Sequence, residues 1–499
     1  MAGSDDKPLL DQIIDYTDRS IVPLHMPGHK RNLQLLQDIQ PNESLPGRTL
    51  PLALDLTEIS GFDNLHEANG ILKQGMARAA SLYGSEHAFY LVGGSTAGIL
   101  AGIRAAVRPG DSVLVARNCH RSVYHALELC RLQPYYLCPP IDPGTGLCGS
   151  IPPEAVERAF HNCPSLRLAI VTSPTYEGVL SDIASLSQIC HEHNVPLLVD
   201  EAHGAHLGFG PFPTGALAAG ADVVIHSLHK TLPSLTQTGL LHVNFRLVDQ
   251  SEVERQLAIF QSSSPSYPLM ASIDACIRWM EEKGSERSHA HMQRLMAFDR
   301  SIAGLKHLWS PGHSDLEIDG RPASPSPFFF ALDPGKIYFC CRNIALEGRP
   351  LTGERLARLL REEYRIETEM AQPGGILAMS SLCDAEDALP RLSDAVREID
   401  RLCIDQTDKG LDATLPPPVI VRSIEEAMTA PRQFVPLAES AGYTAAEYVW
   451  AYPPGIPLLV PGERITEELI QYVEQTIDRE TALHSTSHGL PQTLRVCGM

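Results

Sequence analysis

In the stretch ADVVIHSLHKTLPSLTQTG, residues 221–239, a short apolar run is followed directly by polar and ionisable side chains. Val223–Ile225 reads as a buried strand, and His226, Ser227, His229 and Lys230 follow within five residues. A lysine at the end of a buried strand is desolvated, which disfavours its charge. An uncharged lysine amine is a nucleophile towards carbonyl groups. The stretch therefore predicts a covalent catalyst at Lys230, with an ordinary surface lysine as the alternative.

Short apolar runs alternate with helical patterns on both sides of this stretch, between about residues 85 and 245. The predicted strands are 87–92, 111–116, 134–138, 167–173, 196–200, 222–227 and 239–244, and predicted helices between them are 97–107, 122–132, 154–161 and 183–193. Continuous apolar strands alternating with helices predict parallel strands covered on both faces. Such sheets bind ligands at the carboxyl ends of their strands.

Four units are predicted along the 499 residues: an N-terminal arm (1–50), a large α/β domain (51–305), a smaller α+β domain (306–408) and a C-terminal domain (409–499). Further helices are expected at 252–260 and 271–281 in the large domain. In the smaller domain, 325–334 and 376–383 read as strands, and 352–364 and 385–403 as helices. The proline-rich stretch 410–419 reads as a linker.

The bulk composition narrows the class of protein. A formal net charge of -20 argues against nucleic acid or an anionic membrane as partner. No apolar stretch reaches the roughly 20 residues that span a bilayer, and the first residues lack the pattern of a signal peptide. The 12 cysteines include no C-x-x-C pair. These features predict a reduced, cytoplasmic protein.

Small and hydroxyl-bearing residues follow the predicted strand 87–92, in the order Gly93-Gly94-Ser95-Thr96-Ala97-Gly98. Ser95 and Thr96 would open a helix, where free N–H groups and the positive end of the dipole attract anions. This segment can be interpreted either as a phosphate-binding site or as a plain helix cap. The spacing of a P-loop is absent.

Two further strand ends carry polar side chains. His120 follows the strand 111–116, where its imidazole could stack on a flat ring or lie in a loop. Asp200 ends the strand 196–200, and a buried carboxylate there needs a cationic partner. A protonated pyridine nitrogen is such a partner. His203 and His206 have the spacing of a metal pair but lack a third ligand, so no metal is predicted.

The letters DEAH at 200–203 resemble a helicase motif, but no Walker lysine precedes them and the chain is acidic. The strand ends instead carry, in chain order, a candidate phosphate-binding turn, an imidazole that can stack on a ring, a carboxylate for a ring nitrogen and an amine for a Schiff base. The acid lies 30 residues before the lysine (230 − 200). Together these features predict pyridoxal 5'-phosphate held by an α/β protein.

The sequence resembles the Orn/Lys/Arg decarboxylase family of fold-type-I pyridoxal-phosphate enzymes, and among them the short bacterial forms without an N-terminal wing domain. The resemblance rests on HMPGHKRN (25–32), DLTEISGFDNLHEANGILK (55–73), GGSTAGI (93–99), RNCHRSV (117–123), TSPTYEGV (172–179), VDEAHGAH (199–206), SLHKTLPSLTQTG (227–239), SSSPSYPLMASID (262–274) and, more loosely, the turn at 452–463. It covers most of the chain and implies a fold-type-I large domain with a mostly parallel sheet, a smaller α+β domain and a C-terminal domain.

The resemblance also implies roles for individual residues. Lys230 would bond the cofactor, His120 would stack on its ring, Asp200 would pair with the pyridinium nitrogen, and His203 would lie near the ring. The phosphate would be held by Ser95, Thr96, Ser227 and His229. His229 and Lys230 are alternative proton donors to Cα. One serine of 262–264 would reach the phosphate in a neighbouring subunit, and the segments 25–32 and 55–73 would lie at the mouth of the site or at the partner's site.

The implied reaction is decarboxylation of a basic L-amino acid in polyamine biosynthesis. Arginine to agmatine is favoured over lysine to cadaverine or ornithine to putrescine. Glu58, Asp63 and Glu463 are candidates to bind the distal cation of the substrate, with a surface or turn acid as the alternative for each. A homodimer or larger homo-oligomer with sites at the interface is expected. The alternatives are another fold-type-I enzyme, such as an aminotransferase or lyase, and an inactive regulatory homologue.

Overall fold

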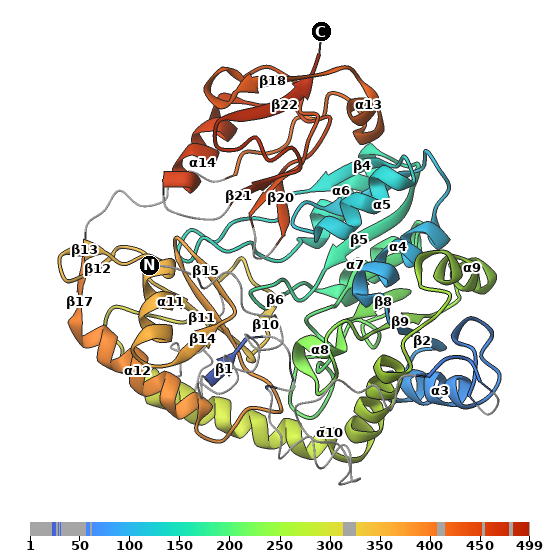
Figure 1. The fold of residues 1–499 in the computed structure, drawn as a ribbon, viewed down its shortest axis with the longest axis horizontal. Helices are drawn as coiled ribbons and strands as arrows, with labels where there is room; N and C mark the ends of the chain where they lie inside the picture. The colour runs from blue at the N-terminus through green and yellow to red at the C-terminus, as the bar shows by residue number, and fades with distance from the viewer. Residues whose placement is uncertain are drawn as a thin grey trace, which may run out of the picture.

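The computed structural model describes residues 22–25, 28, 30, 56–59, 62–312, 326–406, 415–451, 455–478 and 483–498. A large α/β domain lies at the centre, a smaller domain packs beside it, and the C-terminal residues form a separate lobe (Figure 1). None of the helices in these ranges is both long enough and apolar enough to cross a bilayer.

A seven-stranded sheet forms the core of the large domain. Its order is β2 (His87–Leu91), β9 (Gly239–Val243), β8 (Val223–His226), β7 (Leu197–Asp200), β5 (Leu166–Thr172), β3 (Ser112–Ala116) and β4 (Gln133–Leu137). The five strands from β8 to β4 run parallel. The expected mostly parallel sheet is therefore confirmed.

One predicted strand of the set, β9, runs antiparallel to both of its neighbours. Only the short helix α8 (Leu228–Thr231) and a turn separate β8 from β9. A parallel return is usually made through a full helix that packs across the sheet. The connection 227–238 contains only the four-residue helix α8, and the chain returns alongside β8 in the opposite direction.

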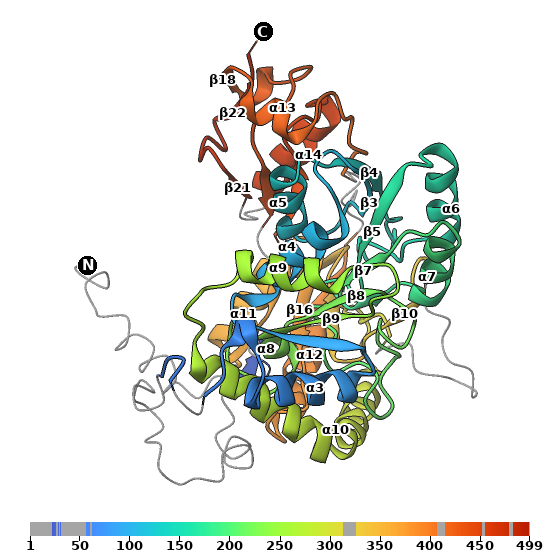
Figure 2. The same cartoon turned by 90° about the vertical axis from the view of Figure 1, so that its right-hand side faces the viewer.

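Helices cover both faces of the sheet, as Figure 2 shows. They are α4 (Gly94–Ala106), α5 (Arg121–Leu129) and α9 (Gln250–Phe260) on one side and α6 (Pro153–Asn162) and α7 (Ile183–Glu192) on the other. Side chains of β8 are fully buried at Val223, Val224 and Ile225. Burial on two faces explains why these strands lack polar alternation.

Helix α10 (Tyr267–Ile302) is much longer than the predicted helix at 271–281. It packs against α3 (Ile71–Tyr83) of the large domain and α12 (Ala388–Leu402) of the smaller one. The polar run Glu281-Glu282-Lys283 masks the pattern in the sequence, yet buried residues such as Gly284 and Leu295 continue it. Packing first against α3 and then against α12 thus stabilises one continuous helix across the base of the molecule (Figure 1).

The smaller domain is built on β11 (Lys336–Cys340), β16 (Gly375–Met379) and β15 (Met370–Gln372), with α11 (Gly353–Glu362) and α12 outside them. A second sheet joins β13 (Arg349–Pro350), β12 (Ile344–Leu346) and β17 (Cys403–Asp405). Strand β14 (Ile366–Thr368) pairs in parallel with β1 (Val22–Leu24) of the N-terminal arm. The arm is thereby tied to the smaller domain.

The predicted strand at 325–334 is wrong over most of its described length. Only β10 (Ala331–Leu332) pairs, with β6 (Val179–Leu180). Phe329 donates its N–H to the carbonyl of Ser326 at 2.8 Å, which closes a turn. Strand β11 lies just beyond this segment and was not predicted from the sequence.

The C-terminal lobe contains α13 (Ile424–Thr429), α14 (Glu467–Asp478) and two small sheets. One pairs β18 (Arg432–Pro436) with β22 (Thr493–Cys497), and the other orders β20 (Ile456–Leu459), β19 (Val449–Ala451) and β21 (Leu483–Ser485). Helix α13 contacts α5 of the large domain. The lobe therefore sits over the β3–β4 side of the large sheet (Figure 1).

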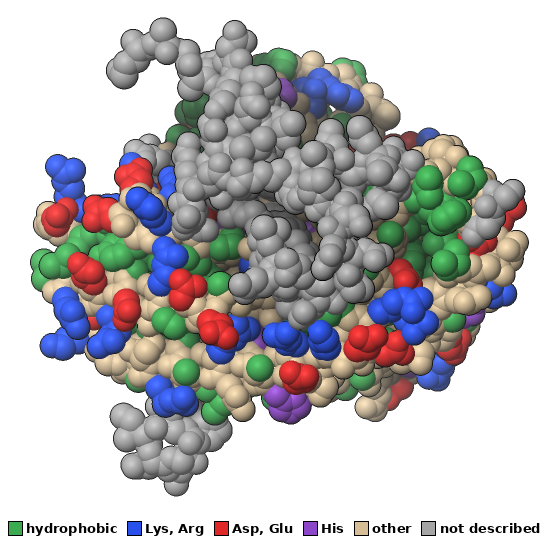
Figure 3. Space-filling view, turned by 60° about the horizontal axis from the view of Figure 1, so that its bottom comes forward, with side chains coloured by type: hydrophobic (Ala, Val, Ile, Leu, Met, Phe, Trp, Pro, Cys, Tyr) green, Lys and Arg blue, Asp and Glu red, His purple; other side chains and the backbone are tan. Residues whose placement is uncertain are grey.

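The molecule seen from its base carries Lys and Arg side chains interspersed with Asp and Glu (Figure 3). On the part of this face that the described residues form, neither sign gathers into an extended field. The acidity of the chain is therefore not concentrated on this side.

Candidate active site

Polar side chains gather where the parallel strands of the large sheet end. Asp200, the last residue of β7, lies in register with Ile225 of β8 and Thr172 of β5. The carboxyl ends of these strands share one edge, which is the edge where such sheets bind ligands. Helix α8, which carries Lys230, begins directly after β8 at the same edge.

The amine of Lys230 meets an imidazole. Its Nζ lies 3.0 Å from Nε2 of His203, which is buried. Burial lowers the pKa of Lys230, while Asp200 and Glu369 oppose the shift. The expected chemistry for this lysine, an amine that loses its charge easily, therefore fits its surroundings.

Asp200 is a buried carboxylate that accepts the N–H of Ala202 at 3.2 Å. Burial raises its pKa, and the nearby charge of Lys230 opposes the rise. Buried carboxylates are stable when a cation or several donors satisfy them. A cationic ring nitrogen at this edge would supply that partner.

His120 caps the start of α5. Its Nδ1 accepts the N–H of Ser122 at 3.3 Å and lies 2.8 Å from the Ser122 hydroxyl. Burial lowers the pKa of His120 to about 3, with smaller contributions from Lys230, Arg121 and His125. The ring is therefore neutral near pH 7 and held in one orientation, which suits stacking on a flat ring.

The start of α4 has no side-chain cap hydrogen bond in the described structure. Gly93 provides no side-chain cap, and Gly94 has a φ of 73° that favours glycine. Gln237 donates to the carbonyl of Val92 at 2.6 Å, and the N–H of Leu228 donates to Thr238 at 3.2 Å. The turn before β9 thus joins the start of α4 to the start of α8.

The hydroxyl of Ser227 is buried and has no hydrogen-bond partner among the described residues. Buried hydroxyls are nearly always paired, so a lone one points to an absent partner. A phosphate held between α4 and α8 would accept from it. Ser95 is half-buried and Thr96 exposed at the start of α4, where both could contact the same anion. These residues fit the phosphate of pyridoxal phosphate.

One ring nitrogen of His229 is bound to the backbone and is not available to a phosphate. Its Nδ1 donates to the carbonyl of Thr238 at 2.9 Å, which leaves Nε2 as the free acceptor in the neutral ring. Burial lowers its pKa to about 4. A neutral Nε2 without a proton cannot donate to a phosphate oxygen, so the predicted phosphate contact of His229 lacks support in this geometry.

Part of the motif at 25–32 packs directly on the lysine helix. The N–H of Gly28 donates to the carbonyl of His229 at 2.5 Å, and Ser381 donates to the carbonyl of Gly28 at 2.7 Å. Lys30 donates to the carbonyls of His25 and Met379 at 2.7 and 2.8 Å. The described residues of this motif therefore support α8 from the same chain.

Three site residues were missed by the sequence analysis: Tyr176, Lys336 and Glu369. Lys336 Nζ lies 2.6 Å from Nδ1 of His203, opposite Lys230. Tyr176 packs its ring on His203 at 4.7 Å between centroids and donates to Glu369 at 2.5 Å. Tyr176 lies inside the quoted motif at 172–179, which could have flagged it, whereas Lys336 and Glu369 carry no local signal.

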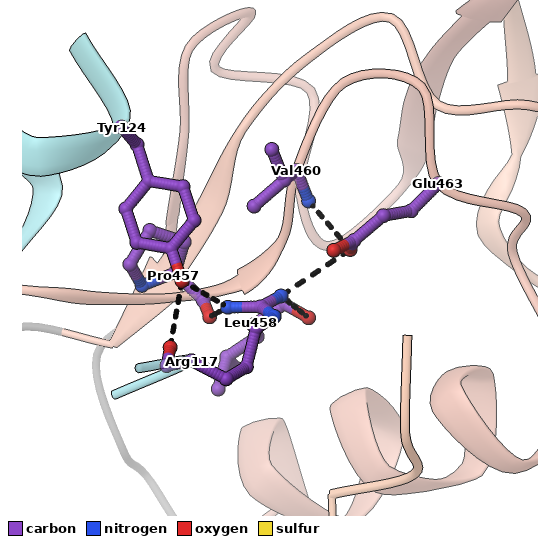
Figure 4. Close-up of polar contacts among 6 residues, drawn as sticks. All are labelled: Arg117, Tyr124, Pro457, Leu458, Val460 and Glu463. Atoms are coloured by element: carbon purple, nitrogen blue, oxygen red, sulfur yellow. Dashed lines mark hydrogen bonds and ion pairs between the residues drawn. The ribbon is translucent and has the colours of Figure 1, made fainter. Parts of the chain in front are cut away.

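The structure gives two of the predicted substrate acids a structural role. Asp63 accepts backbone N–H groups near the start of α3, among them Asn69 at 3.0 Å and Gly70 at 2.7 Å. Glu463 is buried and binds Arg117 at 3.2 Å and the N–H of Val460 at 2.9 Å (Figure 4). These engagements correct the expectation that either carboxylate is presented to a substrate. Glu58 is exposed, and no described contact assigns it a role.

Ser262, Ser263 and Ser264 are exposed after α9. Ser262 donates to the carbonyl of Ser264 at 3.2 Å, and its own carbonyl lies 2.8 Å from Nε2 of His66. The segments around Ser262 and His66 therefore lie together at the surface.

His206 pairs with Asp333 at 3.0 Å rather than with His203, and the described ranges hold no cluster of three metal-ligating side chains.

The chain matches two models of known families. Residues 7–385 match Orn/Lys/Arg decarboxylase, major domain, and residues 418–484 match Orn/Lys/Arg decarboxylase, C-terminal domain. It is 30% identical over 494 residues to an arginine decarboxylase of Bacillus anthracis, covering 98% of this chain and 97% of the relative. It is 32% identical over 504 residues to an arginine decarboxylase of Halalkalibacterium halodurans, covering 99% and 98%.

Among solved structures, a lysine decarboxylase of Francisella novicida superposes with a TM-score of 0.74 at 20% identity, covering 99% of this chain and 84% of that one. This likeness establishes the fold-type-I architecture. The match to the family runs through most of the chain and includes the edge that carries Lys230. The chain belongs to the Orn/Lys/Arg decarboxylase family of pyridoxal-phosphate-dependent carboxy-lyases.

Proposed function

We propose that this protein decarboxylates arginine to agmatine and so supplies a precursor for polyamine synthesis. The observation that carries the proposal is the placement of the Lys230 amine, 3.0 Å from His203, at the sheet edge where Asp200 ends β7. The choice of arginine is supported by relatives named arginine decarboxylase that align over nearly the whole chain. Lysine and ornithine are the competing substrates. No disulfide joins any of the 12 cysteines, all of which lie in the described ranges, and this supports a reducing cytoplasmic compartment.

Five residues would hold the cofactor in this proposal. Lys230 would bond it, Asp200 would face its ring nitrogen, His120 would stack on its ring, and Ser227 and Ser95 would receive its phosphate. Pyridoxal phosphate, when bound, would supply an aldehyde for the amines and a ring that accepts the electron pair left at Cα when CO2 departs. The rest of the chemistry falls to the chain itself.

Asp200 and His120 make complementary electrostatic contributions. A carboxylate that is poorly solvated interacts strongly with a nearby cation, so Asp200 would keep a ring nitrogen protonated. His120 is neutral near pH 7 because burial lowers its pKa to about 3. It therefore adds a packing surface without adding a charge that would compete with Asp200.

Lys230 is favoured over His229 as the proton donor to Cα. In the neutral ring, the single proton of His229 is committed to Thr238 through Nδ1. Its pKa of about 4 makes the imidazolium rare near neutral pH. Lys230 has no such restriction, and its amine contacts His203, which can pass a proton.

We also propose a homodimer with active sites at the interface. Exposed apolar side chains at Phe62, Leu235 and Ile259 support a covered surface near the start of α10. Phe62 packs edge-on against Tyr267, and Leu235 donates its N–H to Ser272, so two of the three border that helix. Light scattering at micromolar concentration should give twice the chain mass, and Phe62→Glu with Leu235→Glu should give monomers.

The test of the reaction is release of labelled CO2 from arginine, lysine and ornithine, each supplied separately as the 1-14C amino acid. The expected result is release from arginine that is lost in Lys230→Ala and retained in Lys306→Ala, an exposed lysine outside the site. Release from lysine or ornithine alone would overturn the choice of substrate. A bound cofactor with keto-acid formation instead of CO2 would favour an aminotransferase, and no cofactor absorbance would favour an inactive homologue.

A further inference from the structure

His203 lies between two lysines in the described structure. Lys230 Nζ is 3.0 Å from its Nε2 and Lys336 Nζ is 2.6 Å from its Nδ1. His203 is 5% exposed and Lys336 is 3% exposed. The two amines come from different domains, since Lys230 lies in α8 and Lys336 opens β11.

The hydrogen-bonding capacity of these groups limits their charge. A neutral imidazole has one N–H donor and one acceptor nitrogen, and an ammonium group can only donate. Two ammonium groups on opposite sides of His203 would therefore leave one N–H facing another in a buried site. The arrangement is satisfied only when at least one of the two lysines is a neutral amine that accepts from His203.

The remaining proton belongs on a lysine rather than on the histidine. A free amine is about four pH units more basic than an imidazole, and burial lowers the pKa of His203 well below its usual value, with both lysines adding to the effect. Burial lowers the pKa of Lys336 to about 7, and the charge of Lys230 contributes to that lowering, so the two amines compete for one proton. The charged groups that influence Lys336 are Asp333, Glu369, Glu177, Lys30 and Lys230.

Lys336 has no other evident task that would hold its amine there. Among the described residues, the groups that contact its Nζ are His203, the sulfur of Met379 at 3.3 Å and the ring of Tyr176 at 5.8 Å. None of these contacts is an anion. A lysine placed only for packing would not turn its amine to a histidine nitrogen within the site.

We propose that Lys336 and Lys230 share a single proton through His203, and that Lys336 thereby keeps the Lys230 amine neutral. When Lys230 gives up its proton, Nε2 of His203 takes it and Nδ1 passes its own proton to the Lys336 amine. One proton moves from Lys230 to Lys336, no electrons are transferred, and a lone pair is left on Lys230 Nζ. Lys336 is thus a positioning residue that acts through His203.

This inference rests on the proposed function only in taking Lys230 as the amine that bonds a carbonyl group. Its test is the reactivity of Lys230 in the full-length chain after the cofactor is dialysed away. Trace acetylation from about pH 6 to 10, read by peptide mass spectrometry, reports the midpoint at which Lys230 becomes nucleophilic. The measurement requires no decarboxylation, so failure of the proposed reaction would not affect it.

Three variants at the site and one control variant distinguish the outcomes. Lys336→Met should shift the Lys230 midpoint upward by about one pH unit or more, a tenfold loss of labelling at a fixed pH near 7.5. Lys336→Arg, a permanent donor-only cation, should keep labelling near the unmodified level at that pH. His203→Gln separates the lysines and should shift the midpoint as Lys336→Met does, while the exposed Lys306→Met should not.

An unchanged midpoint in Lys336→Met would overturn the proposal. Thermal unfolding of each variant identifies any that fails to fold. If Lys336→Met is one of them, His203→Gln decides, and an unchanged midpoint there has the same consequence. A second readout is the pH dependence of the visible absorbance of the cofactor-loaded protein, which should shift in Lys336→Met and be restored in Lys336→Arg.

Discussion

Arg117 and Glu463 form a buried ion pair, 3.2 Å between Nη2 and the carboxylate, that joins the end of β3 to the C-terminal lobe. Arg117 also donates to the carbonyls of Pro457 and Leu458 at 2.6 and 3.3 Å (Figure 4). Arg117 lies three residues before His120 in the same loop. The lobe is therefore fastened to the loop that carries the ring-stacking candidate.

Removal of either partner should be costly. Arg117→Ala or Glu463→Ala leaves a buried charge unpaired, and we expect a loss of about 3–5 kcal/mol in the free energy of unfolding, measured in urea. The double variant should lose less than the sum of the single variants, because it leaves neither charge behind. Glu281→Ala, which breaks a half-exposed pair with Arg78, should cost at most about 1 kcal/mol. A similar small loss in Arg117→Ala would contradict the assignment.

Asp200→Asn should separate cofactor binding from catalysis. The amide keeps the shape of the side chain but loses the charge that would hold a ring nitrogen protonated. We expect CO2 release to fall by at least about 100-fold, since losing a buried charge pair is worth several kcal/mol. Asp222→Asn is the matched control, because Asp222 is equally buried but lies before β8, at the opposite edge of the sheet. That variant should lose stability and keep its turnover per folded molecule.

Much of this site was predictable because several of its residues lie directly at or after the apolar strands that position them. Lys230, Asp200 and His203 each follow an apolar strand, and parallel topology brings strand ends to one edge. Lys336 and Glu369 lie more than 100 residues later (336 − 230 = 106) and reach the site only through packing of the smaller domain. Glu463 was misread for the same reason. Its partner, Arg117, lies 346 residues away, and no pattern within one element reports such a contact.

Gly28→Ala should disturb the lysine helix from outside. A Cβ at Gly28 would lie 2.5 Å from both the backbone N of Leu232 and the carbonyl carbon of Thr231, and backbone atoms cannot turn aside. We expect α8 to shift and the cofactor to be retained less well, which equilibrium dialysis would measure. Gly304→Ala is the control, since a Cβ there meets nothing within 4 Å. Equal cofactor retention in both variants would show that the arm does not support α8.

Acid should weaken the fold before the carboxylates titrate. Burial holds the pKa of His242, His203 and His291 well below the usual 6.5, and that of His229 at about 4. Between about pH 6.5 and 5 the unfolded chain therefore binds protons that the folded chain does not. As the pH is lowered through that window, the free energy of unfolding should decrease by up to about 1.4 kcal/mol per pH unit for each such histidine.

The opposing effect comes from carboxyl groups whose pKa burial raises, such as Asp200 and Asp384, because the folded chain then binds the extra proton. Urea unfolding at pH 7, 6 and 5 measures the balance. His242→Asn removes one buried imidazole on β9 and should flatten the slope. An identical pH slope in His242→Asn and in the unmodified chain would contradict the assignment of a neutral, buried His242.

Ser227→Ala tests whether the unpaired hydroxyl beside α8 is reserved for an anion. A buried hydroxyl without a partner costs about 1–3 kcal/mol in desolvation, so its removal should leave the cofactor-free protein as stable or more stable. The same variant should bind pyridoxal phosphate about tenfold more weakly, because one donor to the phosphate is lost. Ser187→Ala reverses the pattern. Its hydroxyl donates to the carbonyl of Gly220 at 2.7 Å outside the site, so stability should fall while cofactor affinity stays unchanged. If Ser227→Ala instead behaves like Ser187→Ala, the hydroxyl serves the fold, and the phosphate must lie elsewhere along the start of α4.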